Sequence, residues 1–321
     1  MSVQRIAVIA FAVAVAVAVA VRAAVAQAQG YPSKPVRFVT SEPGGGNDIV
    51  ARVLAEGLTA SLGQRVIVDN RGIVAAEIAK NAIPDGYTLL VYGANIWLLP
   101  YLRQHVAWDP LRDFAPITIA VQLPNVLVVH PAVPVKTTRE FIDYARTRPG
   151  KLDYAAGTIG VSPHLAAELF KSMTALDLVR VPYKGGGPAL NGLIAGETQI
   201  MFPNIGSVMT HMKSGRVRAL GVSSAQPSAL APGLPTIASV VPGYEFVAVI
   251  CLYAPAKTPR TIVEQLNSEA ARVLKAPEIK ERLFNAGNEV VANSAAEFAA
   301  YMKADMQKMG KVIKDAGIRG E

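Results

Sequence analysis

The chain has 321 residues, of which 51% are hydrophobic and 17% charged, so it can bury a large core and is not a disordered chain. A single cysteine, Cys251, excludes an internal disulfide framework and any cysteine-cluster zinc site. The four histidines lie far apart, without metal-ligand spacing, so we expect neither a metal nor a cofactor. A net charge of +8 without a run of lysines or arginines argues against nucleic-acid binding and supports only a mild attraction for anions.

The N-terminus has the pattern of a secretory signal peptide. A short basic start, residues 1–5, precedes an apolar run over residues 6–21, and Ala26-Gln27-Ala28 then supplies a small-x-small cleavage site. The apolar run is shorter than the ~18–20 residues of a spanning helix, which disfavours the alternative of an uncleaved anchor. We expect cleavage after Ala28 and export of a soluble mature chain, residues 29–321.

After the signal, short apolar strands alternate with helices. The end of the first helix is marked by Gly63 and the start of another by the capping box Thr137–Glu140. The last helix carries a stripe of apolar residues, many of them methionines, which is typical of core packing. Strands are predicted at 36–40, 66–68, 88–91, 117–121, 126–129, 153–155, 178–181, 200–202, 218–223 and 246–253, and helices at 50–62, 75–82, from 137, at 163–173, 188–195 and 205–212, and from 259, 277 and 294.

This alternation predicts an α/β fold with mostly parallel sheets and helices on both faces. A mature chain of this length exceeds one comfortable core, so we expect two domains. Two apolar segments, 121–129 and 246–255, read as crossings between them. We therefore predict a discontinuous first domain, 29–124 plus 252–321, with a second domain, 125–251, inserted into it. Such a layout places a ligand cleft between the domains.

Four loops between a strand and a helix are rich in glycine or other small residues: 43–48, 93–95, 156–164 and 183–188. Glycine lets the backbone approach a ligand, and each helix N-terminus presents unpaired N–H groups and the positive end of a dipole. Several such ends on one cleft make an anion site without any arginine. Each loop taken alone is more often a simple turn.

The sequence gives little support for an enzyme. The glycine-rich turn at 44–46 matches neither of the nucleotide-binding motifs G-x-G-x-x-G and G-x-x-x-x-G-K-S/T, and the hydrolase motif G-x-S-x-G does not occur. Cys251 lies in an apolar strand and reads as a buried hydrophobe. His164, at a predicted helix start, either donates to a ligand or satisfies a loop carbonyl. Asp48 either caps the first helix, the favoured reading, or orients a ligand amine.

Several segments together resemble one family, the Bug (TctC-type) extracytoplasmic solute receptors of tripartite tricarboxylate transporters. The resemblance covers essentially the whole mature chain. The segments that carry it are 31–37, 43–48, 62–64, 69–71, 84–90, 124–129, His164-Leu165 with 168–170, 181–185, 254–259 and 310–313.

The resemblance implies a two-domain periplasmic-binding-protein fold of the Venus-flytrap, type II-like kind, which closes on a small carboxylate. It implies a monomeric, non-enzymatic periplasmic receptor that delivers a di- or tricarboxylate or an aromatic acid to the permease subunits of a tripartite transporter. Two alternatives are a receptor that acts on a sensor protein and an exported isomerase or lyase using Asp48, His164 and Lys184. The ligand-binding residues expected from the loops and the resemblance are Gly44, Gly45, Gly46, Asn47, Asp48, Gly93, Ala94, Asn95, Gly157, Thr158, Gly160, His164, Lys184, Gly185 and Asn204.

The sequence departs from the family pattern near these loops. Glu42 stands where the family has an apolar residue or proline, and Ala156 and Val161 replace hydroxyl residues. The glycine-rich stretch after Arg71 is shortened to residues 72–74, and Val249 with Cys251 replaces the usual tryptophan and glycine. These changes suggest an unusual anion or a more apolar aromatic acid as the ligand.

Overall fold

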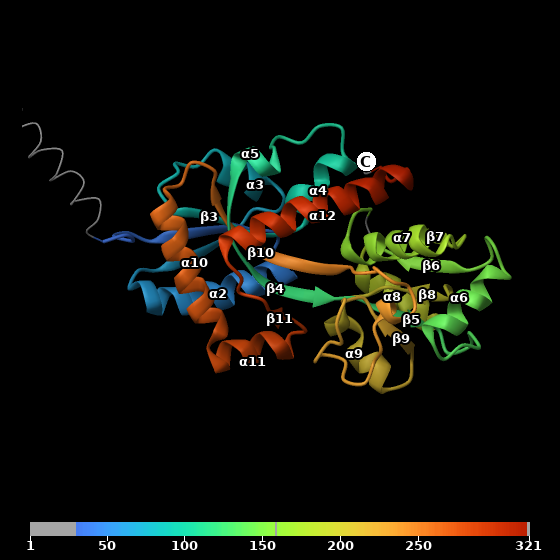
Figure 1. Cartoon of the computed structure of the whole chain (residues 1–321). Helices are drawn as coiled ribbons and strands as arrows, with labels where there is room; N and C mark the ends of the chain where they lie inside the picture. Colours follow the sequence, from blue (N-terminus) through green and yellow to red (C-terminus); the bar gives the residue numbers. More distant parts are fainter. Residues whose placement is uncertain (1–29, 158, 320–321) are drawn as a thin grey trace, which may run out of the picture.

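Two long strands, β4 (Phe114–Pro124) and β10 (Val247–Pro255), pair antiparallel along their length and carry the chain between two α/β domains (Figure 1). The computed structural model describes residues 30–157 and 159–319. The predicted signal peptide, 1–28, and Thr158 lie outside these residues. Each domain has its own sheet with helices on both faces, which is the two-domain fold that the alternating sequence predicts.

The first sheet has the strand order β11-β4-β10-β3-β1-β2. β1 pairs in parallel with β2 and β3, whereas β10 runs antiparallel to β3 and β4 because it returns the chain from the second domain. The mostly parallel pairing predicted from sequence therefore describes the β3-β1-β2 side. The remaining strands of this sheet are β1 (Val36–Thr40), β2 (Val66–Asn70), β3 (Thr88–Gly93) and β11 (Glu289–Val290).

Both faces of the first sheet are buried. Successive side chains of a strand point to opposite faces, so Leu89 and Val91 of β3 pack with one helix layer while Leu90 and Tyr92 pack with the other. The layer on the Leu89 face contains α2 (Gly46–Leu62), α10 (Arg260–Lys275) and α11 (Pro277–Asn285). The opposite layer contains α3 (Val74–Lys80), α4 (Asn95–Leu102) and α12 (Ala295–Asp315), and the short helix α5 (Pro110–Asp113) contacts α4 and β4.

The second sheet has the order β7-β6-β8-β5-β9. β6 is parallel to β7 and β8, and β5 is antiparallel to β8 and β9. Its strands are β5 (Val126–Val129), β6 (Asp153–Ala156), β7 (Val179–Pro182), β8 (Ile200–Met201) and β9 (Arg218–Val222). Its helices are α6 (Thr138–Arg146), α7 (Ser162–Thr174), α8 (Gly186–Ala195) and α9 (Ile205–Lys213), followed by the 3₁₀ turn η1 (Ile237–Ser239).

The crossing from β4 to β5 passes through a buried polar residue, Asn125. Its backbone N–H donates to the Ser223 hydroxyl at 2.7 Å, and its side-chain amide donates to the Phe202 carbonyl at 2.6 Å. Residues 247–251, which the predicted boundary assigns to the inserted domain, belong to β10 and pair with the first sheet. The exact domain boundaries stay a prediction.

Helix α12 connects the domains on a second side. It begins with a capping box between Ser294 and Glu297, and its stripe Phe298, Met302 and Met309 is buried, which confirms the predicted core role. The C-terminal half extends beyond the first domain and packs on α7 of the second (Figure 1). Within residues 30–157 and 159–319, none of the helices is both long and apolar enough to cross a bilayer.

The sequence did not predict α4, α5 or β11. Helix α4 consists almost entirely of apolar residues and contains Pro100, so it shows neither an amphipathic period nor a clean helix signal. Helix α5 has only four residues and β11 only two, which is too short for a periodic pattern. Both follow from tertiary packing.

Candidate functional site

A cavity of about 350 Å³ lies between the two domains, where β4 and β10 meet the second domain. Small and polar residues at the starts of helices form one part of its wall, and apolar side chains with the backbone of β10 form another. The lining residues are Gly46, Asn47, Gly93, Ala94, Asn95, Leu98, Leu123, Gly160, Val161, Ser162, Leu165, Asn204, Phe246, Val247, Ala248, Val249, Ile250 and Asp305.

Four helices begin at this cavity: α2 and α4 from the first domain, α7 and α9 from the second. Among the described residues, no side chain caps any of the four. The first N–H groups of a helix have no partner within it, and the helix dipole makes this end positive. Among the described residues that line the cavity, none is a lysine or arginine. The wall can therefore hold an anion through backbone amides.

The first glycine-rich loop is fastened from behind by Asp48. Its carboxylate accepts hydrogen bonds from the Gly44 amide at 2.9 Å, from Asn70 at 2.9 Å and from Arg52 at 3.0 Å. Burial opposes the charged form, but these hydrogen bonds outweigh it and lower the pKa of Asp48. The expectation that Asp48 caps the helix is wrong, because the N-cap residue of α2 is Gly45 and Asp48 instead closes the loop before it.

The second glycine-rich loop is held by His164. Nδ1 of this buried ring accepts the Gly160 amide at 3.1 Å, so the histidine serves a loop amide rather than a loop carbonyl. Burial, aided by Arg180 and Lys171, lowers the pKa of His164 to about 4. The ring is therefore neutral at pH 7. Gly160 itself has φ +80°, a conformation that favours glycine.

Side-chain hydroxyl and amide groups add polar contacts at the start of α7. The Ser162 hydroxyl donates to Asn125 Oδ1 at 2.8 Å, and Asn204 Nδ2 lies 3.4 Å from the same hydroxyl oxygen. Asn125 belongs to the buried crossing between the domains. The hydroxyl at the cavity wall is thus oriented by a segment that joins the two domains.

The third loop leads from β3 into α4 and leaves no room for a side chain. A Cβ on Gly93 would lie 2.9 Å from the Val249 carbonyl oxygen.

Helix α4 lacks one of its regular backbone hydrogen bonds. The Ile96 carbonyl would accept from the amide of residue 100, but this residue is a proline and has no N–H. Nε1 of buried Trp108 replaces that donor at 2.7 Å.

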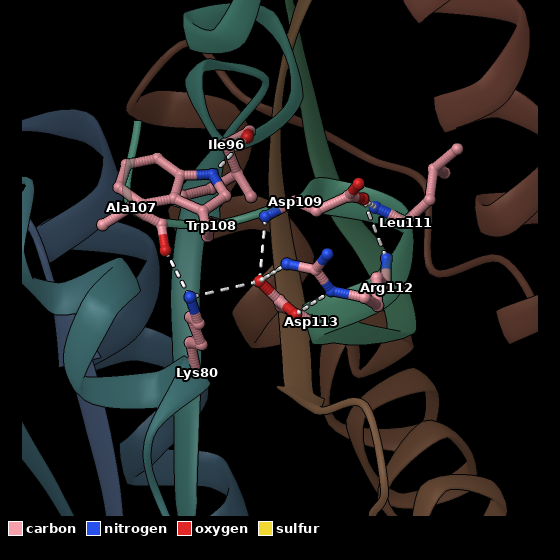
Figure 2. A network of polar contacts seen from close by, with 8 residues as sticks. All are labelled: Lys80, Ile96, Ala107, Trp108, Asp109, Leu111, Arg112 and Asp113. Carbon is pink, nitrogen blue, oxygen red and sulfur yellow. Dashed lines mark hydrogen bonds and ion pairs between the residues drawn. The ribbon is translucent and has the colours of Figure 1, made fainter. Parts of the chain in front are cut away.

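Figure 2 shows how the segment carrying Trp108 is anchored. Asp113 accepts hydrogen bonds from the Asp109 amide at 2.9 Å and from the Arg112 guanidinium at 2.9 Å, and it pairs with Lys80 at 3.5 Å. The hydrogen bond from Arg112 is the largest of the effects that lower the pKa of Asp113 to about 2. This network joins α3 to α5 and so holds the segment that completes α4.

The fourth loop lies outside the cavity wall. Lys184 is exposed, and neither it nor Gly185 lines the cavity. Gly157 packs against the Gly185 backbone, since a Cβ on Gly157 would lie 3.1 Å from the Gly185 carbonyl carbon. The two loops are therefore neighbours, but 183–188 does not reach the cavity.

The expected ligand-binding residues consequently fall into four groups. Asp48 and His164 support loops from behind, Gly44, Gly45, Gly157, Lys184 and Gly185 do not line the cavity, and Thr158 lies outside the described residues. That any of them binds a ligand stays a prediction. Those on the cavity wall are Gly46, Asn47, Gly93, Ala94, Asn95, Gly160 and Asn204.

The residues that depart from the family pattern also lie in different places relative to the cavity. Val161 and Val249 line the cavity, which makes its wall more apolar. Ala156 and Cys251 are fully buried behind it, and burial raises the pKa of the Cys251 thiol, as expected for a buried hydrophobe. Glu42 is exposed, its carboxylate lies next to Gly72, and it does not line the cavity.

Two parts of the cavity wall were not predicted as ligand-binding from the sequence: residues 246–250, which form its floor, and the acidic residue Asp305. The crossing at 246–255 was a usable signal, because a strand that joins two domains runs under the cleft between them. Asp305 follows Phe298 by seven positions and Met302 by three, so helical spacing places its carboxylate on the buried side of α12. This spacing was the signal that could have identified it.

Comparison with known proteins agrees with this architecture. A family model described as "Tripartite tricarboxylate transporter family receptor" matches residues 50–318. Protein BugT of Bordetella pertussis is 31% identical over 91% of this chain and 92% of its own length. An R. palustris structure with adipate is 33% identical, covering 91% of this chain and all of that one, with a TM-score of 0.76.

A second solved structure, MatC of Rhodopseudomonas palustris with bound malate, is 28% identical, with a TM-score of 0.71 over 88% of this chain and 99% of that one. Two other similar structures are those of a periplasmic transporter and of the periplasmic binding protein BugD. With its two α/β domains and its interdomain cavity, the chain belongs to the TctC family of tripartite tricarboxylate transporter receptors.

Proposed function

We propose that this protein is an exported periplasmic receptor that binds a small organic carboxylate in the interdomain cavity and delivers it to the permease subunits of a tripartite transporter. The observation that carries the proposal is the meeting of four uncapped helix N-termini, two from each domain, at one cavity. Hydrogen bonds to a charged group contribute roughly 1.5–3 kcal/mol each, so a few backbone amides suffice for micromolar binding.

The proposed mechanism is a population shift. A carboxylate that contacts amides of both domains binds the closed arrangement better than an open one, and it stabilises closure by that difference. The permease would then recognise the closed form. Two similar structures support small carboxylates as the ligand class, since one was solved with adipate and the other with bound malate.

The proposal includes export, with cleavage after Ala28, and a monomeric receptor without a catalytic step. The alternative enzyme would need Asp48, His164 and Lys184 to act together. Asp48 bonds to Gly44, Asn70 and Arg52, whereas His164 is buried against the second loop and Lys184 is exposed. No specific observation favours that alternative.

The test is calorimetric titration of residues 29–321 with adipate, malate and benzoate, paired with a variant of the α2 start. A Cβ on Gly46 would lie 3.5 Å from the Ile250 side chain, so Gly46→Val fills the cavity beside the amides. We expect wild-type binding in the micromolar range and at least a tenfold loss in the variant.

Gly186→Val is the matched control for that experiment. Gly186 is also the first residue of an uncapped helix, α8, but a Cβ there meets nothing within 4 Å and the residue does not line the cavity. It should bind as wild type does. Equal affinity in the Gly46 variant, or no binding of any acid by a folded wild-type protein, would contradict the proposal.

A further inference from the structure

One ionisable side chain lines the cavity within the described part of the chain, and it is an acid. Asp305 lies on α12, and its Oδ2 accepts a hydrogen bond from Trp97 Nε1 at 2.7 Å. Trp97 is fully buried and packs against Tyr253, Phe298 and Tyr301, so the donor is fixed. The carboxyl group is therefore held in a defined place at the cavity wall.

The second oxygen, Oδ1, accepts no hydrogen bond from any described residue. A carboxylate oxygen has room for two partners, and Oδ1 is not among the buried polar atoms of the described residues that lack one, so it is open to a donor from a ligand. Burial raises the pKa of Asp305 and Glu245 adds to this, while Trp97 and Lys308 oppose it. Leu98, Leu165 and Phe246 line the same cavity, and Lys308, the cation that acts on Asp305, does not line it and donates instead to the Glu245 carbonyl at 2.9 Å.

The cavity thus carries two opposite electrostatic features. Uncapped helix starts favour a negative group, and Asp305 favours a positive group or a hydrogen-bond donor. A dicarboxylate satisfies the first and meets like charge at the second, whereas a zwitterion satisfies both.

Resting on the proposed function, we infer that Asp305 is a specificity-determining residue that accepts a hydrogen bond from a protonated amine of the ligand. The ligand class is then an amino acid whose carboxylate is held by the helix starts. The same side chain selects against diacids of equal length.

The test uses two pairs of ligands matched in length: 6-aminohexanoate against adipate, and 4-aminobutanoate against succinate. Titrated calorimetrically into residues 29–321 at pH 7, the amino member of at least one pair should bind at least tenfold more tightly than its diacid. In Asp305→Asn, which keeps an oxygen for Trp97, this preference should fall to less than threefold.

Glu245→Gln removes an equal charge near Asp305, but Glu245 is exposed and does not line the cavity, so the preference should persist. Wild-type protein that binds diacids as tightly as their amino partners refutes this inference alone, as does an unchanged preference in Asp305→Asn. The wild-type comparison decides the matter even if the Asn variant fails to fold. If no probe and no other organic acid binds, the proposed function fails and this inference with it.

Discussion

His164 is buried beside the cavity, where its neutral ring accepts the Gly160 amide and so shapes the loop at the start of α7. Asp48 has the equivalent place in the first domain, behind the loop at the start of α2. Both residues hold a glycine-rich backbone in position, Asp48 through its carboxylate and His164 through Nδ1. An aspartate and a histidine, residue types that often act in catalysis, therefore serve here to position main-chain amides.

The pH dependence of stability should reveal His164. Its pKa is about 4 in the folded protein, against about 6.5 in an unfolded chain. Above pH 6.5 both states are neutral; as the pH falls from 6.5 toward 4, the unfolded state binds the proton first, so stability is lost across this window, by about 3 kcal/mol in total.

Urea unfolding between pH 7.5 and 4.5 measures this loss. In His164→Gln, which keeps an acceptor for Gly160, the part of the pH dependence due to the ring should vanish, giving a shallower decline than in wild type. His105→Gln is the control, because His105 is exposed and its replacement should leave the decline unchanged. Identical profiles for wild type and His164→Gln would contradict the assignment.

Among the helices, α4 depends most clearly on a contact from outside itself. Pro100 removes the donor for the Ile96 carbonyl, and Trp108 supplies one from the following segment. Trp108→Phe should leave this carbonyl unsatisfied and lower the free energy of unfolding by roughly 1–3 kcal/mol.

A second substitution tests whether the lost hydrogen bond causes this effect: Pro100→Ala restores the missing N–H in α4, at an exposed position. In the Trp108→Phe background it should recover a good part of the lost stability in urea unfolding. A double variant no more stable than Trp108→Phe alone would show that the loss comes from the cavity left by the indole, not from the hydrogen bond.

How far the sequence predicts the fold also differs between elements. α2 was predictable because Val50, Leu54 and Leu58 recur at helical spacing and Gly63, at φ +66°, ends it. α4 was not, because its apolar run shows no period. Within the site, helix starts rich in glycine were recognisable from local sequence, whereas Asp305 reaches the cavity only when α12 packs beside Trp97, 208 positions away in the chain.

At the scale of the whole molecule, the domains also touch beside the cavity. Leu102, at the end of α4, lies so close to Gly160 that a Cβ there would come within 2.4 Å of Leu102 Cδ1. One buried cluster of apolar side chains runs from α12 and α4 in the first domain to α6 and α7 in the second. The described arrangement therefore has the domains in contact, as a ligand bridging both would require.

Gly160→Ala should disfavour this contact. The added methyl group meets Leu102 only when the domains are together, and φ +80° adds local strain that is independent of domain position. A ligand must then supply the extra free energy of closure, so its affinity should fall at least tenfold, and X-ray scattering should show a larger radius of gyration at equal ligand concentration.

Leu102→Ala in the same chain separates the two effects. It removes the atom that the new methyl group would meet, so affinity should recover toward wild type, while the loss of stability from the backbone strain at residue 160 should remain. An affinity that stays low in the double variant would show that the strained loop, not the contact between the domains, weakens binding.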